Sequence, residues 1–329
     1  MPKVSIIIPC RNEEGTIRFL LEAIHRQTFP NQDMEVVIAD GLSEDRTRDE
    51  IANFKKDYPK LQVHVIDNHT LTIPAAINTA IAAAKGEIIL RLDAHSVPDQ
   101  SYVAKSVENL EAKKGTVVGG VWKIKASEDT WIGHAIAAAA AHPLGVGDAK
   151  YRYTEIAESV DTVPFGAYYK TLIDQVGNFD ESLLSNEDYE FNVRVRKAKG
   201  RIWLDPKITA IYFARPNLQA LAKQYWRYGF WKVKTLRRFP DSLRWRQVVP
   251  PLFITSIIIL GLLSIWWPLA SWILLLEVVL YWVALFQVGM QLASENKRFT
   301  HIFGVPLAIA TMHFFWGSAF LWSSIRKKD

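Results

Sequence analysis

Two side chains able to bind a metal ion stand two positions apart after a strongly apolar stretch. Asp93 and His95 follow residues 87–92, whose apolar character predicts a buried strand. In open parallel α/β sheets, ligands bind beyond the carboxyl ends of the strands. A carboxylate and an imidazole at that edge can hold a divalent ion against a diphosphate. The same pattern also occurs by chance on loops, so its meaning depends on the rest of the chain.

A second acidic motif lies further along the chain, where Glu187 and Asp188 open a segment expected to be a helix. Acidic side chains in a first turn stabilise the positive end of the helix dipole, which by itself explains the pair. A carboxylate near a substrate hydroxyl can also act as a general base. Taken alone, the motif does not distinguish these two roles.

The elements that position these residues alternate between strand and helix up to about residue 121. The expected strands are residues 4–9, 35–40, 63–66 and 87–93. The expected helices are residues 14–27, a helix capped by Ser43 that runs to residue 58, and residues 75–84. This alternation predicts an α/β fold with a mostly parallel sheet and flanking helices.

Several classes of site are disfavoured by what the sequence lacks. No Gly-x-Gly-x-x-Gly follows the first expected strand, and there is no Walker loop. A dinucleotide dehydrogenase or a P-loop enzyme is therefore disfavoured, and another group must neutralise a bound diphosphate. Cys10 is the sole cysteine, which excludes an internal disulfide, a cysteine zinc cage and a redox pair.

The apolar residues, 49% of the chain, collect after Val248. Residues 248–267, 269–291 and 304–325 are long and apolar enough to cross or enter a bilayer. Many of the 12 tryptophans stand at the edges of these segments, which suits an aromatic belt at the membrane surface. We expect a membrane domain, with buried soluble helices as the alternative.

Positive charge is concentrated directly before these segments. Between Lys207 and Gln247 the chain has ten lysines and arginines against one acidic residue, Asp241. Such a stretch fits an anionic cytoplasmic leaflet, and the N-terminus lacks a signal-peptide core, so we expect the N-terminal domain in the cytoplasm. Nucleic acid is the rival partner and is disfavoured, because the patch adjoins segments of hydrocarbon length.

The expected topology contains a conflict. Three full crossings would place Arg326 and the two following lysines outside, against the positive-inside trend. Either the last segment is re-entrant or interfacial, or this rule fails here. The prolines at 250–251 and the Trp-Trp-Pro sequence at 266–268 also permit a hairpin that only dips into the bilayer.

Four motifs together resemble one family. They are Pro-Cys-Arg-Asn-Glu at 9–13, Asp-Gly-Leu-Ser-Glu-Asp at 40–45, Asp-Ala-His at 93–95 and Asn-Glu-Asp at 186–188. Over roughly residues 3–230 the chain resembles the family-two inverting glycosyltransferases with the GT-A fold. The resemblance is strongest to bacterial succinoglycan-type membrane glucosyltransferases that extend a polyprenyl-diphosphate-linked sugar. It implies a catalytic domain over 1–215, basic amphipathic interfacial helices over 216–247, and a membrane domain of about three helices over 248–329.

The resemblance implies roles on the donor side. Pro9, Arg11 and Glu13 match the loop that holds the nucleoside, where Glu13 can accept from ribose hydroxyls. Asp40 matches the acidic residue that reads the base, and a carboxylate can accept from the uracil imide N–H. Arg91 is a donor-binding residue or, equally, a structural partner of the first metal-motif residue.

The resemblance also implies the metal site and the base. Asp93 and His95 match the family's Asp-x-Asp motif, with histidine in the second acidic place. This departure keeps a nitrogen ligand and leaves Mg²⁺ or Mn²⁺ open. Asp188 matches the general base, which takes the proton from the attacking acceptor hydroxyl.

Further residues are expected on the acceptor side and at the interface. Glu187, Gly166 and Gln224 are expected to bind the acceptor, although Glu187 could instead shape the helix start. Gln224 and Arg227 resemble the Gln-x-x-Arg-Trp element of processive relatives, with Tyr228 in place of the tryptophan. Arg227 could reach the donor diphosphate or lie at the membrane surface on a basic amphipathic helix.

The function implied is transfer of a sugar, with glucose as the first expectation, from a UDP-sugar to a polyprenyl-diphosphate-linked saccharide at the cytoplasmic membrane. Membrane lipids are expected partners and nucleic acid is not. A polyprenyl-phosphate sugar synthase is the nearest alternative. A membrane-anchored sugar-nucleotide-binding scaffold without turnover is an alternative of another class. A polymer-translocating synthase is disfavoured, because three segments are few for a channel.

Overall fold

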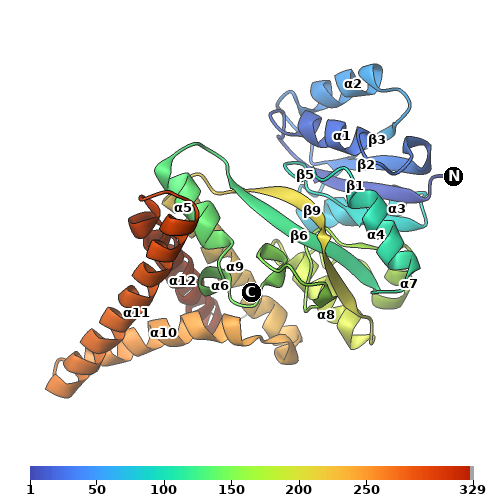
Figure 1. The fold of residues 1–329 in the computed structure, drawn as a ribbon. Coiled ribbons are helices and arrows are strands. Elements are labelled where there is room, and N and C mark those ends of the chain that lie inside the picture. Colours follow the sequence, from blue (N-terminus) through green and yellow to red (C-terminus); the bar gives the residue numbers. More distant parts are fainter. Residues whose placement is uncertain (327–329) are drawn as a thin grey trace. The chain divides into compact units, whose positions relative to one another are not determined.

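A computed structural model describes residues 1–326 of this chain; Lys327 and Lys328, on which the topology argument partly rests, lie outside the described residues. The chain folds into two compact units (Figure 1). The first comprises Met1–Lys123 and Lys150–Tyr212, and the second comprises Ile124–Ala149 and the chain from Phe213 onward. The predicted domain boundaries at residues 215 and 247 remain a prediction.

Half of the sheet in the first unit is parallel. Its strands are β1 (Val4–Cys10), β2 (Met34–Asp40), β3 (Gln62–Asp67) and β4 (Ile88–Arg91). They lie in the order β3-β2-β1-β4, and all three pairings are parallel. β1, β2 and β4 are almost fully buried because helices cover both faces, as their nearly continuous apolar sequences predict.

The other half of the sheet is largely antiparallel. It consists of β5 (Val97–Pro98), β6 (Val117–Ala126), β7 (Glu158–Ser159), β8 (Ala167–Tyr169) and β9 (Ile202–Ala214). β8 pairs antiparallel with both β4 and β6, and β9 pairs antiparallel with β5 and β7. Three of these strands have two or three residues, too few to produce a readable alternation of polar and apolar residues.

Helices cover both faces of the sheet (Figure 1). α1 (Ile17–His25), α2 (Thr47–Asp57) and α4 (Tyr102–Glu111) pack on one face. α3 (Ile73–Ala83), α7 (Leu172–Val176) and α8 (Glu187–Lys197) pack on the other. Neighbouring β1 residues divide between the two cores, since Ile6 and Ile8 join the first and Ile7 the second. The period-two alternation of the strand therefore anchors both layers.

Two helices begin later than the sequence predicts. α1 begins at Ile17 and not at residue 14, and α2 begins at Thr47 and not after Ser43. The Ser43 hydroxyl donates to the Asp40 carboxylate at 2.5 Å, and the Ser43 backbone N–H donates to the same carboxylate at 3.1 Å. Ser43 thus shapes the loop after β2 and does not cap a helix.

The second unit is helical. Its helices are α5 (Trp131–Ala140), α6 (Pro143–Val146), α9 (Leu218–Arg238), α10 (Trp245–Leu263), α11 (Pro268–Glu295) and α12 (His301–Ile325). By length and composition, α10, α11 and α12 could each cross a membrane. Short 3-10 turns occur in the first unit at Asn31–Asp33 and Lys150–Arg152, and in the second unit at Pro240–Ser242.

Candidate active site

The first unit gathers most of the predicted site residues at one edge of its sheet. Asp40 ends β2 and Arg91 ends β4, while Glu13 follows β1. Because β2, β1 and β4 are parallel neighbours, their carboxyl ends meet at this edge. The first turn of α8 contributes Glu187, which contacts Arg91. The fold therefore brings together motifs that are far apart in the sequence.

Asp40 is fully buried at this edge. Besides its bonds from Ser43, its Oδ2 lies 2.6 Å from the guanidinium of Arg48. The same guanidinium donates to Asp67 at the end of β3 over 2.5 Å and holds the pKa of that carboxyl below its usual value. Arg48 thus connects the ends of two strands, and nothing in the sequence pattern marked it as a site residue.

The loop after β1 packs against the loop after β2. A Cβ at Gly41 would lie 3.2 Å from the Arg11 side chain, so the absence of a side chain at Gly41 leaves room for Arg11. Arg11 is exposed, and Pro9 pairs within the sheet with Ala39. The Arg11 side chain therefore lies against the start of the loop after β2.

Glu13 holds His95 across 82 residues of sequence. The Glu13 carboxylate lies 3.0 Å from the Nδ1 atom of His95, and its second oxygen accepts from the Thr16 hydroxyl at 2.5 Å. The Glu13 backbone N–H donates to the Thr47 hydroxyl at 2.7 Å. Glu13 was expected to contact a ribose, and its partner in the structure is the histidine of the metal motif.

Arg91 connects the metal motif to the acidic helix start. Its Nη2 atom donates to Asp93 at 3.1 Å and to Glu187 at 3.0 Å. Arg91 is only 8% exposed. Burial opposes the charged guanidinium, but the carboxylates of Asp93, Glu187 and Asp188 raise the pKa of Arg91 above its usual value. Arg91 therefore stays charged inside the site.

Glu187 and Asp188, the first two residues of α8, lie in a poorly solvated place. Burial raises the pKa of Glu187, partly opposed by Arg91 and reinforced by Asp188. Burial likewise raises the pKa of Asp188, again partly opposed by Arg91. The half-buried Asp188 accepts from the Tyr189 backbone N–H at 2.7 Å. A raised pKa makes a carboxylate a stronger base, which suits the predicted role of Asp188.

The backbone around this site has positive φ at four non-glycine residues, Asn12, Leu42, Phe165 and Asn186. Asn186, directly before α8, has φ +64°, and Phe165 has φ +49°. Positive φ is tolerated by asparagine but strained for a bulky aromatic residue. Tyr102 fixes this segment, because its buried hydroxyl donates to the Phe165 carbonyl at 3.1 Å. Such strain concentrates at functional sites.

Gly166 follows the strained Phe165 and lies beside Arg91. Its carbonyl accepts from the Arg91 backbone N–H at 3.3 Å. A Cβ at Gly166 would lie 2.7 Å from Val117, so no side chain fits without a shift. An aromatic group adjoins this segment, since Trp122 stacks on Tyr212 at 4.1 Å and lies 5.5 Å from Phe165. No sequence pattern predicted this group, because its members are far apart in the chain.

Two predicted site residues belong to the second unit. Gln224 and Arg227 both lie on α9. Gln224 is buried and donates to the Tyr228 hydroxyl at 3.0 Å, whereas Arg227 is exposed. Their predicted contacts with acceptor and donor remain predictions.

The residues present fit a divalent cation only if a substrate supplies further ligands. Among residues 1–326, no three His, Cys, Asp or Glu side chains gather in a metal-binding group. Mg²⁺ is typically held by one or two carboxylates together with substrate phosphates and water. Two features fit such a site. Three carboxylates act on the single cation of Arg91, and the Glu13 carboxylate orients His95 as ligand histidines usually are oriented.

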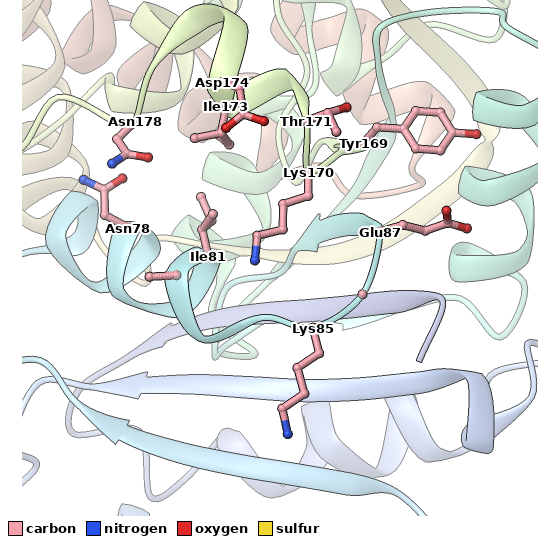
Figure 2. A pocket seen from close by; sticks show the side chains of 12 residues that line it. Asn78, Ile81, Lys85, Glu87, Tyr169, Lys170, Thr171, Ile173, Asp174 and Asn178 are labelled. Carbon is pink, nitrogen blue, oxygen red and sulfur yellow. The ribbon is translucent and has the colours of Figure 1, made fainter. Parts of the chain in front are cut away.

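A cavity of about 560 Å³ lies elsewhere in the first unit. Figure 2 shows it between α3 and the segment that follows β8, with Asn78, Lys170 and Asn178 among the labelled side chains. It is also lined by Lys85 and Glu87, which precede β4, so it adjoins the amino end of that strand. None of the predicted site residues lines this cavity.

Two curated relatives match most of the chain. The succinoglycan biosynthesis protein ExoA of Rhizobium meliloti (strain 1021) is 29% identical over 320 residues, which cover 96% of this chain and 93% of that protein. A second relative, from Methanococcus voltae, is 29% identical over 268 residues, which cover 79% of this chain and 82% of that protein. It is a dolichyl N-acetyl-alpha-D-glucosaminyl phosphate 3-beta-D-2,3-diacetamido-2,3-dideoxy-beta-D-glucuronosyltransferase.

A solved structure and a family model complete the comparison. A mannosyltransferase of Pyrobaculum calidifontis in complex with GDP-Man and Mn²⁺ superposes with a TM-score of 0.62 at 18% identity. The match covers 94% of this chain and 87% of that one, and it confirms the GT-A-like α/β fold. The model described as "Glycosyl transferase family 2" matches residues 5–177, more than half of the 329-residue chain. The chain therefore belongs to glycosyl transferase family 2.

Proposed function

We propose that this glycosyltransferase moves a hexose from a UDP-sugar to a polyprenyl-diphosphate-linked saccharide, with inversion at the anomeric carbon. The observation that carries the proposal is the position of Arg91, which bonds both Asp93 of the metal motif and Glu187 beside Asp188. The donor-binding and acceptor-activating motifs then act in one site.

Asp188 is the proposed general base. Its carboxylate takes the proton from the acceptor hydroxyl, while the hydroxyl oxygen bonds to the anomeric carbon and the bond to the nucleoside diphosphate breaks. Burial raises the pKa of Asp188, which strengthens it as a base. A single displacement needs no nucleophile from the protein, so one base suffices.

The donor side is proposed to use the loops after β1, β2 and β4. Asp93 and His95 would hold Mg²⁺ or Mn²⁺, which supplies positive charge for the departing diphosphate. Glu13 positions His95 through the 3.0 Å contact. Arg11 and Asp40 would contact the nucleoside. The Asp40 carboxylate also accepts hydrogen bonds from Ser43 and Arg48.

A lipid-linked acceptor is supported by the relatives. The names of the R. meliloti and M. voltae proteins refer to succinoglycan biosynthesis and to a dolichyl-linked sugar phosphate. Three helices of this chain are long and apolar enough to enter a membrane, where such an acceptor resides. Because the P. calidifontis structure contains GDP-Man, GDP-sugars are tested beside UDP-sugars.

Release of nucleoside diphosphate by the detergent-purified protein tests the proposal. A panel of UDP- and GDP-sugars is offered with Mg²⁺ or Mn²⁺, with and without polyprenyl-diphosphate-linked monosaccharides. Metal-dependent release that requires UDP-sugar and the glycosylated lipid supports it. Release with bare polyprenyl phosphate instead indicates a polyprenyl-phosphate sugar synthase. Donor binding without release from any pair indicates a scaffold.

A further inference from the structure

α12 is the interior helix of the second unit, although its sequence has the length and composition of a membrane span. In the most apolar 18-residue stretch of α12, 50% of the stretch is buried, compared with 17% of the corresponding stretch in α10 and 11% in α11. Its Gly304 packs against Ala135 of α5, and its Met312 packs against Gly145 of α6. Because so much of α12 is covered by protein, less of its surface can contact lipid than in α10 or α11.

α9 runs alongside α12 in the same direction. Gly229 of α9 faces Trp316, since a Cβ at Gly229 would lie 2.3 Å from the Trp316 carbonyl oxygen. Eight residues further along α9, Arg237 donates to the carbonyl of Ser323 at 2.8 Å and to that of Arg326 at 3.0 Å. The contact points advance by similar steps on both helices, as in a parallel pair.

The composition of α9 excludes it from the hydrocarbon interior. The helix contains six cationic residues and no acidic one: Lys223, Arg227, Lys232, Lys234, Arg237 and Arg238. Each Lys or Arg costs about 2.5–3.5 kcal/mol at the centre of a membrane helix. A bilayer-spanning α12 would carry α9 into the membrane with it. The side-by-side packing therefore argues against a third crossing.

The hairpin of α10 and α11 has the opposite character (Figure 1). Its contacts with α12 lie in the half nearer its base: Gly317 packs against Pro250 and Gly289 against Ile302. The last of them is midway along α11, where the Tyr281 hydroxyl lies 3.2 Å from Nδ1 of His313. Towards the tip, the apolar side chains are exposed. Glu277, within α11, accepts a hydrogen bond from Ser256 of α10, so this polar pair is satisfied inside the hairpin.

The length of α10 matches a bilayer. Trp245 begins α10 and Trp266 follows its end, a separation of about 30 Å at the helical rise of ~1.5 Å per residue. This equals the ~30 Å thickness of the hydrocarbon core and places an exposed tryptophan at each surface. Pro250 lies about 7 Å along α10, within the depth of ~5–10 Å that interfacial helices reach.

We infer that the chain crosses the membrane twice, as the α10–α11 hairpin, and that α12 lies with α9 in the surface of the leaflet on the side of the catalytic unit. The exposed cations of α9, among them Lys223, Arg227 and Arg238, then meet anionic headgroups. This arrangement also keeps Arg326 on the same side as Arg244, as the positive-inside trend requires.

Single cysteines in the full chain test this topology. The native Cys10 is 5% exposed, so the unmodified protein serves as the background control. Asn53→Cys on exposed α2 marks the catalytic unit, Ser264→Cys marks the hairpin tip, and Ser324→Cys marks the end of α12. A membrane-impermeant maleimide is added to sealed inverted vesicles and to right-side-out vesicles, before and after detergent.

The expected result is that Ser324→Cys reacts from the same side as Asn53→Cys, whereas Ser264→Cys reacts only from the opposite side. Reaction of Ser324→Cys from the opposite side would establish a third crossing and overturn the inference. Reaction of Ser264→Cys from the Asn53 side would overturn it in favour of a dipping hairpin. Ser324→Cys that reacts only in detergent would place α12 in the hydrocarbon and also overturn it.

Discussion

Arg91 donates a hydrogen bond to Glu187 over 3.0 Å, although the two residues are 96 positions apart. The contact joins the carboxyl end of β4 to the first turn of α8, and Arg91 also holds Asp93. The guanidinium can serve two carboxylates at once because its donors are fixed in a planar fork. This geometry makes Arg91 the link between the metal motif and the proposed base.

Replacing Arg91 should therefore cost both stability and activity. Arg91→Met leaves buried carboxylates without their cation, which typically costs about 3–5 kcal/mol and should lower the Tm of the protein by roughly 6–15 °C. Arg46→Met is the matched control, since its pair with Glu50 is exposed and contributes at most ~1 kcal/mol. Thermal unfolding in detergent measures both. An unchanged Tm for Arg91→Met would contradict the structural role.

Asp188→Asn should abolish proton removal while leaving the donor site intact. General-base catalysis contributes about 10²–10⁴-fold, so kcat should fall by at least ~100-fold with little change in donor KM. Glu181→Gln is the control, because it removes a carboxylate that lies outside α8 and accepts a hydrogen bond from Asn78. Steady-state kinetics at saturating acceptor provide the measurement. A kcat for Asp188→Asn within threefold of the unmodified enzyme would remove Asp188 from the mechanism.

The acid limb of the pH profile should report Asp188. The base works when deprotonated, and burial raises its pKa, so activity should be lost on acidification at a higher pH than an ordinary aspartate would give. Arg91 lowers this pKa, so Arg91→Lys, which keeps the charge, should shift the limb less than Arg91→Gln. The measurement is kcat/KM against pH. A limb that is identical in both variants and the parent would argue against this assignment.

Glu13 should act on metal binding through His95. Glu13→Gln removes the charged partner of the imidazole, and loss of such partners typically costs about 10–100-fold in metal affinity. The concentration of Mn²⁺ that gives half-maximal activity should rise accordingly, whereas exposed Glu44→Gln should leave it unchanged. His95→Asp should shift the preference towards Mg²⁺, because carboxylates suit that harder ion. Equal Mn²⁺ requirements in Glu13→Gln and Glu44→Gln would refute the positioning role.

Two glycines of the second unit offer a paired test of helix packing. Gly229→Ala forces a Cβ within 2.3 Å of the Trp316 carbonyl, and such overpacking typically costs about 1–3 kcal/mol. Gly261→Ala in α10 meets no atom within 4 Å among the described residues and should be neutral or stabilising by up to ~1 kcal/mol. Thermal unfolding in detergent compares the two. Equal Tm values would show that α9 and α12 do not pack closely.

The parallel half of the sheet could be predicted from the sequence alone. Short apolar runs rich in β-branched residues, such as Val4–Cys10 and Met34–Asp40, predict strands buried on both faces, and polar residues at their carboxyl ends mark the edge where the site is predicted. The motif that ends in His95 was readable for this reason. The length of the apolar segments after Val248 likewise predicted the three long helices.

Which side chains meet depends on the tertiary structure. The Glu13–His95 and Arg91–Glu187 contacts join residues 82 and 96 positions apart, and Arg48 reaches Asp40 from a helix that begins later than expected. Apolar content likewise cannot distinguish a helix buried by protein from one buried by lipid, because both exclude water. The close approach of Gly229 to Trp316 distinguishes α12 from the two hairpin helices, because it shows that α9 packs directly on α12.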